Sequence, residues 1–241
     1  VGCNEGEIAF FGGSFTAIDK SYMTELLERA YKYVSEGLFK GIRISTRPDC
    51  ISRDVLEILK SYGVTAIELG CQSMDDRVLE LNTRGHTHLD VINAAELIRE
   101  YGFELGVQMM TGLYGDNDEG AIRTAEKLIA LSPDTVRIYP TIVLEGTRLC
   151  ELYRNGEYSP QSIEEAAELC KTLLMMFEEK SIKVIRLGLH SGGNVQDGFV
   201  AGPYHPAFRE ICESKIYLDK VFHFVSSYLS KSIYSMKSNN V

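Results

Sequence analysis

The chain has 241 residues, of which 44% are hydrophobic and 24% are charged, and its net charge is −9 at pH 7. This composition is typical of a folded globular protein and excludes disordered, collagen-like and low-complexity classes. The excess of acidic residues argues against broad electrostatic binding to a nucleic-acid backbone, and no apolar run of about 18 residues indicates a membrane-spanning helix.

Short apolar runs alternate with amphipathic segments along the whole chain. Ser162 and Glu165 have the spacing of a capping box, and Gly63 stands where a helix end favours a positive φ angle. In chain order, the pattern predicts strands at residues 8–11, 42–45, 64–69, 103–109, 135–139 and 183–187, separated by helices over 23–34, 52–62, 91–98, 119–131 and 163–177.

Strands separated by helices of this length indicate right-handed βαβ units and a parallel sheet. About six strands are too few for a closed eight-stranded barrel, so a doubly wound sheet and an incomplete barrel both remain open. Either architecture places a functional site on the loops at the carboxyl ends of the strands.

Polar and glycine-rich segments follow the predicted strands at this edge. Their concentration on one rim is typical of a substrate or cofactor site, although a plain strand-to-helix turn explains the Gly12-Gly13 pair equally well. The sequence lacks the phosphate-binding patterns of P-loop and Rossmann enzymes. The segments are Gly12–Thr16, Ser45–Asp49, Gly70–Ser73, Gln108–Gly115 and Arg137–Thr141.

Gln72 and Arg84 are the first candidates for ligand contacts. Gln72 follows a strand directly, where its amide can bind a polar ligand, and Arg84 offers a cation suited to a carboxylate. Without further context, a surface ion pair is the more common role for an arginine such as Arg84.

The histidines give no metal or acid–base pattern. His86 and His88 lack the i, i+4 spacing of a helical metal pair, and no carboxylate completes a ligand set. His205 lies in a rigid Gly-Pro-Tyr-His-Pro turn that either orders a loop over a site or closes the fold, and His190 is a further acid–base candidate. None is assigned to catalysis.

The cysteines are scattered, and no two have the spacing of a zinc knuckle or a redox pair. We therefore expect reduced thiols of a cytoplasmic protein, several of them in the core. The six are Cys3, Cys50, Cys71, Cys150, Cys170 and Cys212.

Three segments resemble the radical S-adenosylmethionine enzymes: EIAFFGGSFT at 7–16, IRISTRPD at 42–49 and IELGCQSMD at 67–75. Within that superfamily, RIYPT at 137–141 strengthens a resemblance to the branch of the Elongator catalytic subunit. Oxygen-independent coproporphyrinogen oxidase is the next most similar relative. The resemblance is specific over residues 7–160 and looser to about residue 215.

The resemblance implies a partial TIM-like (β/α)6 barrel of parallel strands that binds S-adenosylmethionine on a [4Fe-4S] cluster. It divides the chain into a barrel over residues 1–190 and a C-terminal extension over 191–241 that packs on the barrel and ends in a frayed tail. No catalytic residue is assigned. The cofactor-binding positions that it implies are Gly12, Gly13, Ser14, Ser45, Arg47, Gln72, Arg84, Gln108 and Tyr139.

The sequence departs from the family pattern at two places. Ser45 stands where oxidase-type relatives have an acidic residue, and the chain has no C-x3-C-x2-C triplet to bind the cluster. Because the chain begins at Val1 and soon enters a strand, we expect that the first barrel strand and its cluster loop are missing, and that the chain alone is inactive.

Three functions stay open for the whole protein. The first is a radical enzyme that modifies tRNA, although the net charge gives no support for RNA binding. The second is a radical enzyme of tetrapyrrole synthesis. The third is a barrel without a cluster that acts as a binding module. The first two imply a flavodoxin or ferredoxin as electron donor.

Overall fold

The computed structural model describes residues 6–12, 14–189 and 197–238, with side chains up to residue 227. Six strands form one sheet in which every neighbouring pair is parallel. The strands, in their order across the sheet, are β1 (Glu7–Phe10), β2 (Gly41–Thr46), β3 (Val64–Gln72), β4 (Glu104–Thr111), β5 (Thr135–Pro140) and β7 (Lys183–Leu187).

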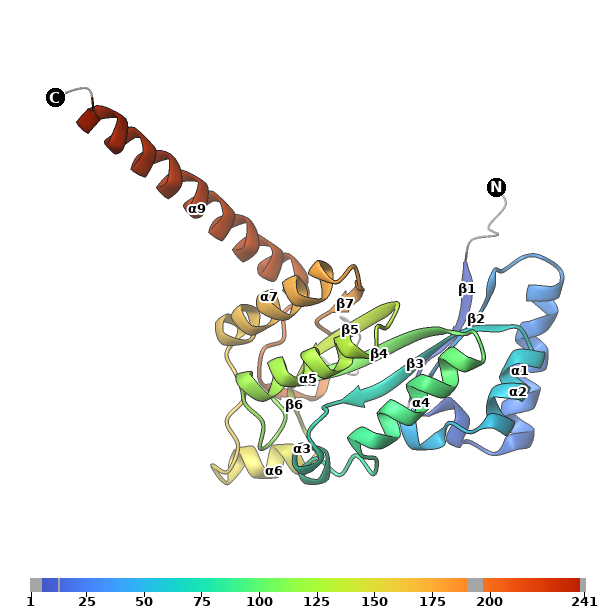
Figure 1. Ribbon diagram of the computed structural model, residues 1–241. Coiled ribbons are helices and arrows are strands. Elements are labelled where there is room, and N and C mark those ends of the chain that lie inside the picture. The colour runs from blue at the N-terminus through green and yellow to red at the C-terminus, as the bar shows by residue number, and fades with distance from the viewer. Residues whose placement is uncertain (1–5, 13, 190–196, 239–241) are drawn as a thin grey trace.

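The spatial order of these strands follows their order in the sequence without a reversal. A doubly wound sheet needs a point where the order reverses, so that alternative is excluded. Successive crossovers on one side curl the sheet into a half-barrel, which Figure 1 shows. The predicted partial barrel is therefore confirmed, whereas the missing first strand and the division near residue 190 stay predictions.

Five of the helices connect these strands in turn and confirm the predicted pattern. The predicted capping box is present: the Ser162 hydroxyl accepts a hydrogen bond from the Glu165 backbone N–H, and the Glu165 carboxylate accepts one from the Ser162 backbone N–H. Gly63 has the predicted positive φ angle, at +69°. The five helices are α1 (Lys20–Ser35), α2 (Arg53–Ser61), α4 (His88–Glu100), α5 (Asp118–Ala130) and α7 (Ile163–Glu179).

The remaining elements were not anticipated from the pattern. Most are too short to show a period: the 3₁₀ turns Phe15–Ala17 and Pro48–Cys50, the helices α3 (Asp76–Leu81) and α6 (Arg148–Arg154), and the antiparallel strands β6 (Val143–Leu144) and β8 (Phe199–Ala201). The last helix, α9 (Phe208–Ser238), extends away from the barrel in Figure 1 and includes residues 231–238, whose polar composition predicts a frayed end.

The beginning of α9 packs on α7 and β7 through buried Phe208, Cys212 and Ile216. Further along, its large apolar side chains are exposed, from Tyr217 to Val225. Among the helices that the structure describes, none combines the length and the apolar character that a membrane span needs.

The two faces of the sheet differ in chemistry because side chains alternate along each strand. On β2, Ile42 and Ile44 are fully buried against the helices, while Arg43 and Ser45 point to the opposite, inner face. The same alternation on β3, β4 and β5 places Glu68, Gln108 and Arg137 on the inner face. The apolar core therefore lies between sheet and helices, and the inner face is polar.

Candidate functional site

The carboxyl ends of β1 to β5 form one rim, because all these strands run in the same direction. The Ser14 hydroxyl lies 2.9 Å from that of Thr46 and accepts a hydrogen bond of 3.3 Å from the Arg47 backbone N–H. The loop after β1 is thus tied to the end of β2, as the predicted site requires.

Gly12 leaves room beside the backbone at this rim. It has φ +118°, a conformation that favours glycine, and a Cβ added there would meet no heavy atom within 4 Å among the described residues. A ligand can therefore approach the main chain closely at Gly12. Its predicted partner Gly13 lies outside the described residues.

Gln72 adopts a backbone conformation that is uncommon for a residue with a side chain. Its φ is +62°, and the residue is only 7% exposed at a register shift in the pairing of β3 with β4. The side chain folds back over Gly70, where an added Cβ would lie 2.9 Å from the Gln72 Nε2 atom. Such a constrained residue at a strand end is a common feature of binding sites.

Ser45 and Gln108 come together on the inner face although they belong to strands that are not neighbours. The Gln108 Nε2 atom donates to the Ser45 hydroxyl at 3.3 Å and to the Glu68 carboxylate at 2.9 Å. The structure thus joins two predicted site residues through a third that the sequence did not single out.

Glu68 is that third residue, and its side chain is only 1% exposed. Arg137 donates to it from Nε at 2.7 Å and from Nη2 at 3.0 Å, and Arg43 Nη1 lies 3.6 Å away. Burial lowers the pKa of Arg137, but the hydrogen bond and charge of Glu68 outweigh it, so that this pKa lies above its usual value. The sequence signal that could have identified Glu68 is a charged residue within an otherwise apolar parallel strand.

Two aromatic residues accompany Arg137. The Phe11 ring lies 5.0 Å below the Arg137 guanidinium and is 59% exposed. Tyr139, a predicted site residue on the same strand, interacts with Arg137 and helps to raise its pKa.

Arg84 has no acidic partner among the described residues, and its buried Nε atom makes no hydrogen bond with them. Burial lowers the pKa of Arg84, and the nearby positive charge of Arg47 lowers it further. The surface ion pair considered for Arg84 is not found among the residues that the structure describes, where the side chain is half-buried. Such a cation is suited to an anionic ligand.

Arg47, by contrast, is already paired. It donates to the Asp49 carboxylate from Nε at 2.9 Å and from Nη2 at 2.6 Å, which raises its pKa. Gly85 makes room for it, because a Cβ there would lie 3.0 Å from the Arg47 Nη2 atom. Arg47 is thus held beside Arg84 and adds positive potential to the same place.

Three of the described histidines, His86, His88 and His205, have structural contacts. His86 lies with Nε2 3.1 Å from the Cys71 carbonyl oxygen, and His88 Nδ1 is 2.6 Å from Asp76. His205 Nδ1 accepts from the Ala207 backbone N–H at 3.1 Å, which orders its turn. His190 lies outside the described residues, and the described part of the chain brings no three His, Cys, Asp or Glu side chains into a metal-binding group.

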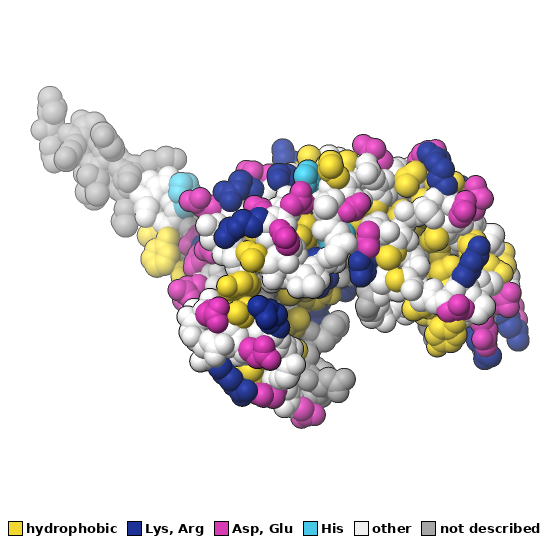
Figure 2. Space-filling view, turned by 90° about the horizontal axis from the view of Figure 1, so that it is seen from below, with side chains coloured by type: hydrophobic (Ala, Val, Ile, Leu, Met, Phe, Trp, Pro, Cys, Tyr) yellow, Lys and Arg dark blue, Asp and Glu magenta, His cyan; other side chains and the backbone are white. Residues whose placement is uncertain are grey.

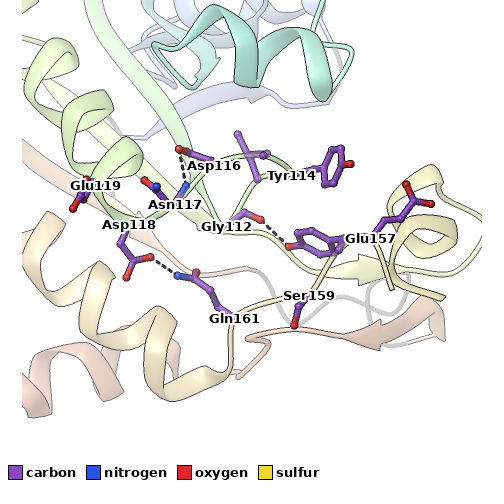
Figure 3. A pocket seen from close by; sticks show the side chains of 12 residues that line it. Gly112, Tyr114, Asp116, Asn117, Asp118, Glu119, Glu157, Ser159 and Gln161 are labelled. Atoms are coloured by element: carbon purple, nitrogen blue, oxygen red, sulfur yellow. Dashed lines mark hydrogen bonds between the residues drawn. The ribbon is translucent and has the colours of Figure 1, made fainter. Parts of the chain in front are cut away.

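A separate hollow of about 580 Å³ lies beyond β4, between the start of α5 and the segment before α7 (Figure 3). The Tyr158 hydroxyl donates to the Gly112 carbonyl oxygen at 2.7 Å, and burial raises the Tyr158 pKa to about 12. Burial also raises the pKa of Asp116. This acidic hollow contains none of the predicted cofactor-binding residues, and an acidic wall disfavours a carboxylate ligand.

Family models and curated relatives match this chain. The family model described as Radical SAM superfamily matches residues 4–128, and the Radical_SAM C-terminal domain matches 133–218. The tRNA uridine(34) acetyltransferase of Methanocaldococcus jannaschii is 33% identical over 187 residues, covering 69% of this chain and 34% of the relative. Elongator complex protein 3 of Homo sapiens is 31% identical over 191 residues, covering 70% and 35%.

Solved structures give the same picture of the fold. The archaeal Methanocaldococcus infernus Elp3 with an N-terminal deletion superposes with a TM-score of 0.77 at 25% identity, covering 90% of this chain and 55% of that one. Coproporphyrinogen III oxidase (HemN) of Escherichia coli superposes with a TM-score of 0.57 at 18% identity, covering 73% of this chain and 40% of that one. This second similarity concerns the fold alone. The chain spans about a third of the length of the curated relatives described above.

Proposed function

The chain belongs to the radical S-adenosylmethionine superfamily, and we propose that its rim binds S-adenosylmethionine as part of an enzyme of the Elongator branch. The observation that carries the proposal is that Arg84, half-buried beside Arg47, has no acidic partner in the described part of the chain. A buried arginine without an acidic partner is costly for the fold, and the methionine carboxylate supplies the missing anion.

The other rim residues fit the remaining parts of the molecule. The open backbone at Gly12 suits the methionine ammonium group, and the Gln72 and Gln108 amides suit the polar edges of the ribose and the adenine. Ser14, Ser45, Arg47 and Tyr139 line or support the same rim. On receiving one electron, bound S-adenosylmethionine would split into methionine and a 5′-deoxyadenosyl radical, and that radical would take a hydrogen atom from a substrate.

The described cysteines do not fit the [4Fe-4S] cluster of the family. Cluster ligands are thiolates placed together, whereas no three of the described cysteines lie together. Cys71, Cys150, Cys170 and Cys212 are buried, and Cys50 is half-buried. Burial raises the Cys71 pKa to about 12, and it also raises the pKa values of Cys170 and Cys212. We propose that the cluster, and the flavodoxin or ferredoxin that would reduce it, engage a part of the whole protein outside this chain.

Calorimetric titration of the chain with S-adenosylmethionine tests the proposal. We expect one saturable site, weaker binding of decarboxylated S-adenosylmethionine, and competition by S-adenosylhomocysteine, which keeps the carboxylate. Equal affinity for the carboxylated and decarboxylated ligands would show that Arg84 does not bind the carboxylate, and the absence of saturable binding would contradict the proposal as a whole.

For the whole protein we propose a role in tRNA modification, on the support of relatives named as tRNA uridine(34) acetyltransferases. On the face shown in Figure 2, Lys and Arg side chains lie among Asp and Glu side chains and form no single basic area. Because the chain also has a net charge of −9, we propose that further parts of the protein supply most of the phosphate contacts. Mass spectrometry of tRNA nucleosides from cells lacking the protein should show loss of a modified wobble uridine; unchanged tRNA with altered tetrapyrroles would contradict this role.

A further inference from the structure

The inner face of the half-barrel contains a buried carboxylate whose contacts reach the proposed cofactor site. Glu68 lies in the middle of β3 and accepts hydrogen bonds from Arg137 of β5 and from Gln108 of β4. At its other side, Arg43 of β2 also contacts Glu7 and Glu104. Glu68 thus connects the ion pairs at the base of the barrel with the rim.

The fold makes space for this arrangement at one position. Glu68 crosses β4 at Gly106 to reach β5, and a Cβ added to Gly106 would lie 2.7 Å from the Glu68 Cγ atom and 3.0 Å from the Thr135 hydroxyl. Any larger residue at Gly106 would displace the Glu68 side chain. The carboxylate therefore depends on a glycine of the strand that it crosses.

The chemistry of the contact determines how the Gln108 amide is turned. A carboxylate paired with guanidinium groups only accepts hydrogen bonds, so the amide must direct Nε2 toward Glu68. Nε2 also donates to the Ser45 hydroxyl, so these two hydrogen bonds use both protons of the Gln108 amide nitrogen. The Gln108 Oε1 atom then accepts no hydrogen bond from any residue that the structure describes.

We propose that Glu68 is a positioning residue: it locks the Gln108 amide with Oε1 directed to the bound ligand, so that the site selects a hydrogen-bond donor there, such as a ribose hydroxyl. The proposal rests on the proposed function for the identity of the ligand. The orientation of the amide itself does not depend on that identity. A purely structural ion pair would stabilise the barrel without affecting Gln108.

The first test needs no ligand. In ¹H–¹⁵N spectra of the chain, the Gln108 carboxamide signals, assigned by their loss in Gln108→Ala, should be resolved and slow to exchange with water. In Glu68→Gln they should shift and exchange at least tenfold faster. Glu104→Gln is the matched control, because the Glu104 carboxylate also accepts from Arg43 (2.8 Å) but accepts no hydrogen bond from the Gln108 side chain in the described structure. It should leave the signals unchanged.

Because Glu68→Gln removes charge from a buried network, Gly106→Ala serves as a second variant that displaces Glu68 and keeps its charge. It should release the Gln108 amide in the same way. Signals in either folded variant that match those of the unaltered chain would overturn the proposal. Rapid exchange of the carboxamide in the unaltered chain would overturn it without any variant.

A double-mutant cycle on S-adenosylmethionine affinity then tests the link to the ligand. Glu68→Gln should weaken binding about tenfold in the unaltered background and less than about twofold in the Gln108→Ala background. An equal loss in both backgrounds would mean that Glu68 acts on the fold alone. If the chain binds no S-adenosylmethionine, the proposed function fails, while the spectra still decide whether Glu68 orients Gln108.

Discussion

Arg84→Gln should reduce the affinity of the chain for S-adenosylmethionine by roughly 10- to 150-fold, the equivalent of about 1.5–3 kcal/mol for a hydrogen bond to a charged group. The glutamine keeps an amide donor on a shorter side chain and carries no charge for the methionine carboxylate. The loss should nearly disappear with decarboxylated S-adenosylmethionine, which lacks the group that Arg84 is proposed to bind. Calorimetric titration with both ligands measures the difference.

The same substitution should not destabilise the fold. Arg84 is half-buried without an acidic partner, and the charge of Arg47 opposes it, so a neutral side chain relieves both costs. We expect the free energy of unfolding in urea to stay constant or to rise. Arg53→Gln, which breaks an exposed ion pair with Glu100, is the control and should leave the affinity unchanged. Full binding by Arg84→Gln, or its unfolding, would contradict this account of the rim.

Phe177→Ala should lower the free energy of unfolding by about 3–5 kcal/mol. Phe177 lies on α7 and is 0% exposed, in the apolar layer between the helices and the sheet. Removing the ring loses the free energy gained by its burial, and the cavity that remains destabilises the fold further. Urea denaturation followed by circular dichroism measures the change.

Phe224→Ala provides the matched control on another helix, because that ring is 71% exposed. We expect a change within about 0.5 kcal/mol there. A cost below about 1 kcal/mol for Phe177→Ala would mean that α7 does not cover the sheet as described.

The strands and long helices could be predicted because their patterns are local. The short apolar runs and the period-3.6 patterns predicted the sheet and its five connecting helices, and the parallel order then placed the predicted site at one rim. The pairing of β6 with β8 left no such signal, since it joins short segments that are far apart in the sequence. Helix α9 was missed for a different reason: Phe208, Cys212 and Ile216 recur every four residues on one buried face, but the exposed apolar residues from Tyr217 to Val225 obscure that period.

The site was predicted as a set of positions but not as a network. Ser45 and Gln108 meet through Glu68, a residue that the sequence shows only as a charge within an apolar strand. Whether Arg84 has an acidic partner depends on neighbours from several loops. From the sequence alone, the prediction was the more common role of an arginine, a surface ion pair. The positive φ of Gln72 coincides with the register shift at the end of β3, and no local sequence pattern indicates either feature.

A crystal structure of the chain with S-adenosylmethionine tests the central claim most directly. We predict that the methionine carboxylate lies at the Arg84 guanidinium, with the Gln108 Oε1 atom accepting from the nucleoside. A ligand bound instead in the acidic hollow between Gly112 and Gln161, with Arg84 still unpaired, would contradict the account.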